Sequence, residues 1–216
     1  MSFMVTDIEK KSGYDPLESG RYDATLHCII ALERQKTVWE GKETVKTRVL
    51  MIFEIPSIER SLSDGTKAPA LQSYEITWSA SMKGNCLGVI NAITHDSHTE
   101  ESLYDFITNE DSIKSLLGKP CVVDVTKKLN KKGNMANYVN GILELDVRLP
   151  QPVPHREPFI FTAKSPDLEI FKQKLLPWTR DKLMSAVNSD EFPKELHKAY
   201  RDIKEQEAAS SGNQLV

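Results

Sequence analysis

The sequence has little of what marks an exported, membrane-inserted or disulfide-bonded protein. Its 216 residues include only three cysteines, Cys28, Cys86 and Cys121. This odd, widely spaced set fits neither a disulfide framework nor a paired metal-ligand motif. No apolar run approaches the ~18 residues of a membrane span, and the first residues lack the apolar stretch of a signal peptide. We therefore expect a protein of the reducing cytoplasm that does not engage a membrane.

Catalytic motifs are also scarce. The segment GKP at 118–120 lacks the glycine spacing and the following Ser or Thr of a phosphate-binding loop, and no Gly-x-Ser-x-Gly elbow is present. The segment HDSH at 95–98 has two histidines, but no cysteine or further histidine lies near it, so a solvated connector is the simpler interpretation. We predict a protein that is not an enzyme, with no catalytic residue, no cofactor and no metal site.

Positive charge is not in excess either, because the formal net charge is -3. An acidic chain binds nucleic acid only if its basic residues are concentrated locally. Two segments have such a concentration. Residues 34–48 contain five basic residues against two acidic ones, and residues 119–135 contain five lysines against one aspartate.

Hydrophobic periodicity predicts three strands, a helical segment and two more strands. In residues 21–35 a period of two places Tyr22, Ala24, Leu26, Cys28, Ile30 and Leu32 on one face. Further strands are predicted over 45–56, ending at Pro56, and over 71–81. Apolar residues three and four apart then predict helices within 85–118. Strand character returns over 120–129 and 136–147, and the turn-like segment 130–134 joins these two strands into a hairpin.

This order is typical of the OB-fold, a small Greek-key barrel that commonly binds oligonucleotides and sugars. We predict a mainly β fold with helices (α+β): a five-stranded OB-type barrel, a helical segment between strands three and four, and a C-terminal helical extension. The predicted division is an N-terminal arm at 1–20, the OB-fold domain at 21–149, a proline-rich connector with the helical extension at 150–203, and a flexible tail at 204–216.

In an OB barrel, the loops between strands one and two and between strands four and five flank one binding face. The two basic segments fall on these loops, so we expect them to converge on one groove that tracks a phosphate backbone. Trp39 lies among charged residues and is the predicted stacking platform for a base, while the orientation of Tyr138 depends on strand register. Trp78 and Tyr74 alternate with polar residues in a strand and are assigned to the core. The predicted nucleic-acid-binding residues are Arg34, Lys36, Trp39, Lys42, Lys46, Arg48, Lys127, Lys128, Lys131, Lys132 and Tyr138.

Several short motifs carry a family resemblance: GRYDA at 20–24, IFEIP at 52–56, LLGKPC at 116–121, NY at 137–138 and LPW at 176–178. With these motifs, residues 20–185 resemble phage-encoded single-stranded DNA-binding proteins of OB type. The resemblance implies binding of single-stranded DNA with little sequence preference, in phage DNA replication or recombination in the host cytoplasm. Many such proteins end in an acidic tip that recruits partners, whereas GNQLV at 212–216 has no acidic side chain.

Two other classes of function stay open at this point. An OB-type protein-interaction or regulatory module would bind no nucleic acid, and its complex would respond less to salt than phosphate binding does. A hydrolase or metal-dependent nuclease would need carboxylates or histidines that only the fold could bring together. A lysine-rich hairpin is also as often a solvated turn as a binding site. Self-association, replication or recombination proteins as partners, and the choice between DNA and RNA are left open.

Overall fold

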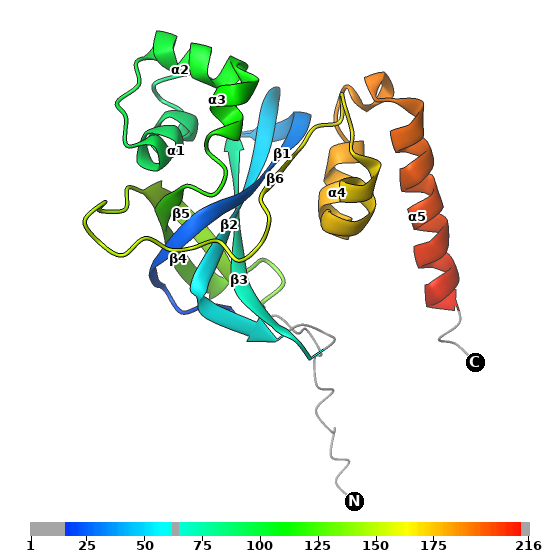
Figure 1. Ribbon diagram of the computed structural model, residues 1–216. Coiled ribbons are helices and arrows are strands. Elements are labelled where there is room, and N and C mark those ends of the chain that lie inside the picture. The colour runs from blue at the N-terminus through cyan, green and yellow to red at the C-terminus, as the bar shows by residue number, and fades with distance from the viewer. Residues whose placement is uncertain (1–15, 62–64, 213–216) are drawn as a thin grey trace, which may run out of the picture.

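The structure is a computed structural model that describes residues 16–61 and 65–212 (Figure 1). Its centre is a mostly antiparallel sheet in which the strand order is β3-β2-β1-β4-β5 and a short sixth strand, β6 (Phe159–Phe161), pairs parallel with β1. The mixed α+β class is confirmed. The five long strands are β1 (Gly20–Trp39), β2 (Lys42–Ser61), β3 (Lys67–Thr77), β4 (Pro120–Leu129) and β5 (Met135–Leu143).

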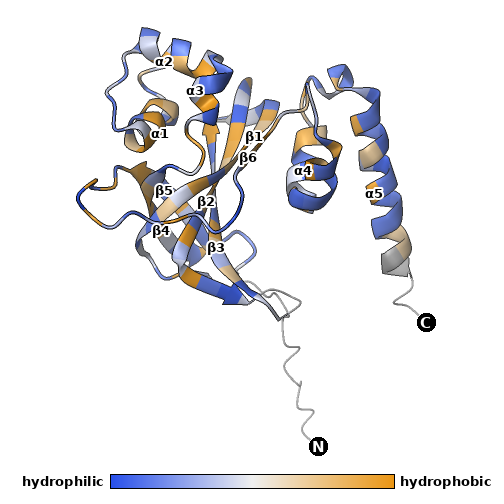
Figure 2. Ribbon diagram, viewed as in Figure 1, coloured by the Kyte–Doolittle hydropathy of each residue, from blue (hydrophilic) through white to orange (hydrophobic). Residues whose placement is uncertain are grey.

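Two groups of helices accompany the sheet. The predicted helical segment between β3 and β4 is present as α1 (Asn85–Thr94), α2 (Glu100–Thr108) and α3 (Glu110–Lys114). After β6 follow a π-helix, η1 (Ile170–Lys174), then α4 (Pro177–Met184), the 3-10 helix η2 (Ser189–Glu191) and α5 (Lys194–Gly212). Figure 1 shows α1 to α3 at one end of the sheet and α4 and α5 beside it, and Figure 2 shows that α5 is mostly hydrophilic. None of the described helices is long and apolar enough to cross a membrane.

The first hydrophobic core lies on the inner face of the sheet. Side chains from all five long strands meet there with the buried faces of α1 and α2, which explains why each of these elements has apolar residues at its own structural period. Burial of this surface is the main source of stability for the strands. Core members include Leu26, Met51, Phe53, Ile76, Ile90, Leu103, Val123 and Ile142.

A second core lies on the outer face of β1 and β2, under the C-terminal extension. The extension supplies aromatic and aliphatic side chains from β6, η1, α4 and α5, and the two strands supply the other half. The rings of Phe161 and Phe171 stack here with centroids 5.8 Å apart. The proline-rich connector therefore leads into an element that packs on the sheet. Members include Cys28, Ile30, Leu32, Leu50, Phe161, Phe171, Leu183 and Leu196.

The prediction of a single apolar face on the first strand is wrong. The pairing of β1 with β2 shifts by one residue between Leu26 and Cys28, so His27 forms a β-bulge. A one-residue shift turns every later side chain to the opposite face. Leu26 accordingly packs in the first core, and Cys28 packs in the second.

Other element boundaries also differ from the prediction, and one strand was not predicted. Strand β2 continues past Pro56 to Ser61, because the irregularity between Ile55 and Glu59 accommodates the proline outside the regular ladder. Trp39 is the last residue of β1, not part of a connection. The short strand β6 was not predicted, since three residues give no periodicity to detect.

The predicted flexible tail is helical as far as it is described. Helix α5 continues to Gly212. The reason is tertiary: Lys204 pairs with Asp181 at 2.8 Å, and Glu207 pairs with Arg180 at 3.3 Å, which ties this stretch to α4. The tail prediction is therefore wrong for residues 204–212, and its last four residues lie outside the described part of the chain.

Candidate nucleic-acid interface

The β1–β2 hairpin carries the first basic cluster. Its two-residue turn, Glu40 and Gly41, has positive φ at both positions (49° and 75°), as the tight hairpin turns that match strand twist require. Trp39 pairs with Lys42 across this turn. The backbone of Trp39 is thus placed, but its side chain lies outside the described residues.

The lysines of this hairpin are exposed. Lys36 pairs with Glu43 across the two strands at 2.9 Å, and both side chains are more than half exposed. Exposed pairs of this kind contribute only about 0–1 kcal/mol, so the ammonium group of Lys36 exchanges partners at little cost. Lys42 and Lys46 are exposed on the same hairpin.

The two arginines at the base of the hairpin are integrated into the fold. The backbone N–H of Arg34 donates to Asn188 Oδ1 (3.3 Å), and its carbonyl accepts from the N–H of Val187 (2.8 Å). Arg48 Nε donates to Glu75 Oε1 at 2.9 Å. The backbone of Arg34 is therefore held by the C-terminal extension, while the residue itself is exposed. Arg48, in contrast, is half-buried in an ion pair.

The β4–β5 hairpin carries the second cluster. Asn130 Oδ1 accepts hydrogen bonds from the N–H groups of Lys132 (2.9 Å) and Asn134 (3.1 Å), and Gly133 adopts a φ of 76° that favours glycine. This locally closed turn exposes Lys131 and Lys132 at the tip of the hairpin.

Strand register separates the remaining lysines of this hairpin. Lys127 faces the chain segment before β1: its ammonium group pairs with Glu18 at 2.6 Å. Lys128 faces outward, and its Nζ lies 4.4 Å from the ring centroid of Tyr138. Tyr138 is 37% exposed, so the register leaves its ring, with a cation above it, on the outer surface.

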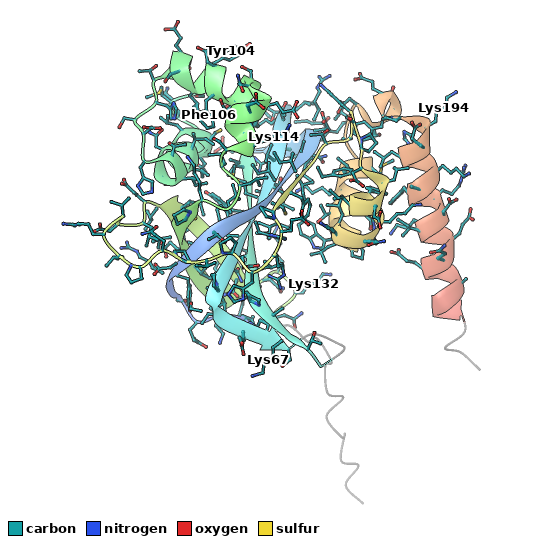
Figure 3. All side chains as sticks on the ribbon, viewed as in Figure 1. Lys67, Tyr104, Phe106, Lys114, Lys132 and Lys194 are labelled. Atoms are coloured by element: carbon teal, nitrogen blue, oxygen red, sulfur yellow. The ribbon has the colours of Figure 1, made fainter. Side chains whose placement is uncertain are left out.

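The structure does not bring the two basic clusters together. Gly20, the first residue of β1, pairs antiparallel with Val125, so β4 runs on to its turn beyond the start of β1. The other turn follows Trp39, at the far end of the same strand. Figure 1 shows the β1–β2 turn at the upper end of the sheet, and Figure 3 shows Lys132 at the lower end. A single nucleic-acid strand that contacts both basic clusters has to run along the length of the sheet.

A groove of about 670 Å³ lies beside the first cluster, where β2 begins and β3 ends. Three cationic side chains line it, Lys46, Arg48 and Lys83, together with the hydroxyl groups of Thr77 and Ser79. Among the described lining residues, the one carboxylate is that of Glu75. We refer to this cavity as the basic groove.

Glu75 does not cancel the positive charge of the basic groove, because it is already neutralised. Its Oε1 accepts from Arg48, and its Oε2 accepts from Lys182 Nζ on α4. Burial of Glu75 opposes ionisation, but the hydrogen bonds from Lys182 and Arg48 together outweigh it and hold the pKa of this carboxyl below its usual value. The groove therefore has a positive potential at neutral pH.

Trp78 lines the basic groove as well. The side chain packs against the first core, as predicted, and its indole N–H donates to the carbonyl oxygen of Ile107 at 3.2 Å. It is only partly buried, so one part of the ring system remains at the groove. Sequence reasoning missed this second role, and it also missed Lys83 and Lys182, since their positions depend on how distant segments pack.

The three cysteines are buried, and their thiols are not activated as nucleophiles. Burial raises the pKa of Cys28 to about 12 and that of Cys86 to about 11, and it raises the pKa of Cys121 as well, so all three thiols stay protonated. Within residues 16–61 and 65–212, no group of three or more His, Cys, Asp or Glu side chains is arranged to hold a metal ion.

No protein-family model matches the chain, and no curated protein matches its sequence.

Proposed function

We propose that this chain is a non-catalytic single-stranded DNA-binding protein of OB type that coats strands exposed during phage DNA replication or recombination. The observation that carries the proposal is the basic groove. It offers Lys46 and Lys83 to a phosphate backbone, its carboxylate is already paired with Arg48 and Lys182, and a tryptophan ring lies beside the cations. Cations that follow the backbone and aromatic rings that stack on bases are the two parts of a site with little sequence preference.

The sheet topology supports the OB assignment. The order β3-β2-β1-β4-β5 places β3 and β5 at the two edges, and residues of these two strands approach one another. A barrel would result from closing this gap, and helix α1 follows β3 as the helix of an OB-fold does. The proposed strand path runs from the basic groove along the sheet toward Lys131 and Lys132.

A protein-interaction module is the second candidate, and one observation favours it. The connector between β5 and β6 exposes three aliphatic side chains, Val147 (69%), Leu149 (51%) and Val153 (69%). Aliphatic side chains exposed on one short segment are a feature of surfaces that bind proteins. The two candidates differ in their response to salt, because only phosphate binding releases many counterions.

Fluorescence anisotropy with labelled oligonucleotides tests the proposal. We expect single-stranded DNA to bind more tightly than duplex DNA, and the affinity to fall steeply with salt. Replacing Lys46 and Lys83 together by alanine should reduce the log–log salt slope by about 1.4, because each phosphate left without its lysine lowers the slope by about 0.7. The matched control replaces Lys194 and Lys198, two exposed lysines of α5, and should leave the slope unchanged. Equal binding of single-stranded and duplex DNA, or no binding, would contradict the proposal.

A further inference from the structure

A second cavity, of about 450 Å³, opens on the outer face of the sheet. Cys28, Ile52 and Leu71 form its floor from three neighbouring strands, and Phe159 and Leu176 come from the C-terminal extension. The volume falls within the range of small-molecule sites, roughly 300–1,000 Å³. We refer to this cavity as the sheet-face pocket.

One wall of the sheet-face pocket is aromatic. The rings of His27 and Phe159 meet edge to face, with centroids 5.4 Å apart and planes at 88°. His27 is 9% exposed, and burial, followed by the charge of Arg156, lowers its pKa. The imidazole is therefore neutral at pH 7. Its Nδ1 is buried and has no hydrogen-bond partner among the described residues.

The rim of the pocket is cationic. Lys174 Nζ lies 5.2 Å from the centroid of the Phe159 ring, and no described carboxylate forms an ion pair with it. Arg156 also lines the pocket, but its guanidinium is paired with the buried carboxylate of Glu54 (3.0 Å to Oε2) and donates to the carbonyl of Pro69 (3.0 Å), so Lys174 is the cation of the rim that faces a ligand. Glu157 is the one acidic side chain among the described residues that line the pocket.

We propose that the sheet-face pocket receives one base of a bound single strand, with the adjoining phosphate at Lys174. This inference rests on the proposed function. The apolar floor and the aromatic wall suit a flat ring, while the cation above Phe159 suits an anion attached to that ring. An aliphatic side chain or a lipid tail would fill the floor but would leave the cationic rim without a role.

The position of the pocket agrees with the proposed strand path. Leu71 in the pocket and Glu75 in the basic groove point to the same face of β3, four residues apart, which corresponds to about 13 Å along a strand. A DNA strand that leaves the basic groove and follows β3 thus reaches the sheet-face pocket directly. It follows that β6 and η1 of the C-terminal extension are part of the DNA site, because they supply Phe159 and Lys174.

Phe159 offers a matched pair of variants as a test. Phe159→Leu removes the ring and keeps an apolar side chain, whereas Phe161→Leu makes the same change two residues along β6, in the second core. Both should lower the melting temperature. Only Phe159→Leu should weaken binding of an oligothymidylate, by between about 5-fold and about 150-fold, the range expected for one stacked base. An oligonucleotide of abasic nucleotides should bind wild type and Phe159→Leu equally.

Lys174→Ala tests the rim without touching the core, and Lys172→Ala is its control, since both lysines are exposed on η1 and only Lys174 lines the pocket. The lysine at the rim should contribute about 0.7 to the salt slope, and the control should contribute nothing. Photocrosslinking with an oligonucleotide that contains 5-iododeoxyuridine should attach the base to a peptide containing His27 or Phe159.

These results separate the two proposals. If wild-type protein binds single-stranded DNA with a steep salt dependence but Phe159→Leu binds as tightly as Phe161→Leu, the pocket is not a base site and the proposed function stands. A crosslink confined to other peptides has the same meaning. If wild type binds no single-stranded DNA, the proposed function itself is overturned. Crosslinking at the pocket, together with the base-dependent weakening in Phe159→Leu, supports the inference.

Discussion

Lys182 on α4 donates a hydrogen bond to the carboxylate of Glu75 on β3, across 107 positions of the sequence. The same carboxylate accepts from Arg48 on β2, so one half-buried anion joins the sheet to the C-terminal extension. This arrangement has two effects at once: it stabilises the packing of α4, and it leaves the basic groove positive.

Glu75→Gln should separate these effects. Loss of the charged hydrogen bonds should reduce the free energy of unfolding at pH 7 by about 1–3 kcal/mol. Because the folded-state pKa of Glu75 is lowered, its contribution is complete above the unfolded value of 4.5 and disappears as the pH falls through the folded value. The stabilities of variant and wild type, measured by urea unfolding, should therefore converge only after the pH has fallen below 4.5 and through the folded-state pKa of Glu75. DNA binding at pH 7 should not weaken, since the variant adds positive charge to the groove.

His27 should make stability pH-dependent in a higher window. Its folded-state pKa lies below the unfolded value of 6.5, so the unfolded chain binds the extra proton first. The stabilisation is complete above pH 6.5 and is lost as the pH falls below it, by at most about 1.4 kcal/mol per pH unit for one proton. Arg156 and Lys174 oppose protonation, and Glu54 favours it. His27→Phe should flatten the stability profile between about pH 5 and 7, and an unchanged slope would assign that dependence to other groups.

Lys131 and Lys132 should act on DNA alone. They are exposed at a turn whose hydrogen bonds come from the backbone and Asn130, so their joint replacement by alanine should change stability by less than about 0.5 kcal/mol. The salt slope should fall by about 1.4. Lys127→Ala is the informative contrast, because this lysine anchors Glu18 and should affect melting more than binding. An unaltered slope in the folded double variant would show that the hairpin is only a solvated turn.

Trp39 and Trp78 should respond differently to replacement by alanine. If Trp39 is a stacking platform, Trp39→Ala should reduce the binding free energy by about 1–3 kcal/mol and melt near the wild-type temperature. Trp78→Ala should destabilise the fold by up to about 3–5 kcal/mol through lost burial. The molecules of this variant that do fold should also bind DNA more weakly than wild type, because the Trp78 ring lines the basic groove. Normal DNA binding by an early-melting Trp39→Ala protein would make Trp39 a packing residue.

The parts of the fold that the sequence predicted well are those with local signals. Alternation over β3, the three helices after it and the β4–β5 turn each depend on neighbouring residues, and all are present. The prediction of a single apolar face on β1 was wrong because this strand has a bulge at His27 and is covered on its outer face by residues much later in the sequence, such as Phe159 and Phe161. The basic groove was only half predicted: Lys46 and Arg48 follow from the hairpin, but tertiary packing alone brings Lys83 to the groove and Lys182 to its carboxylate, Glu75.

The bulge in β1 has a consequence for how the protein unfolds. Because the strand turns Leu26 to one core and Cys28 to the other, neither layer can detach without exposing apolar residues of the same strand. The C-terminal extension and the sheet should therefore behave as one cooperative unit, even though a proline-rich connector separates them in the sequence. Amide hydrogens in the middle of β1 should therefore exchange only through global unfolding.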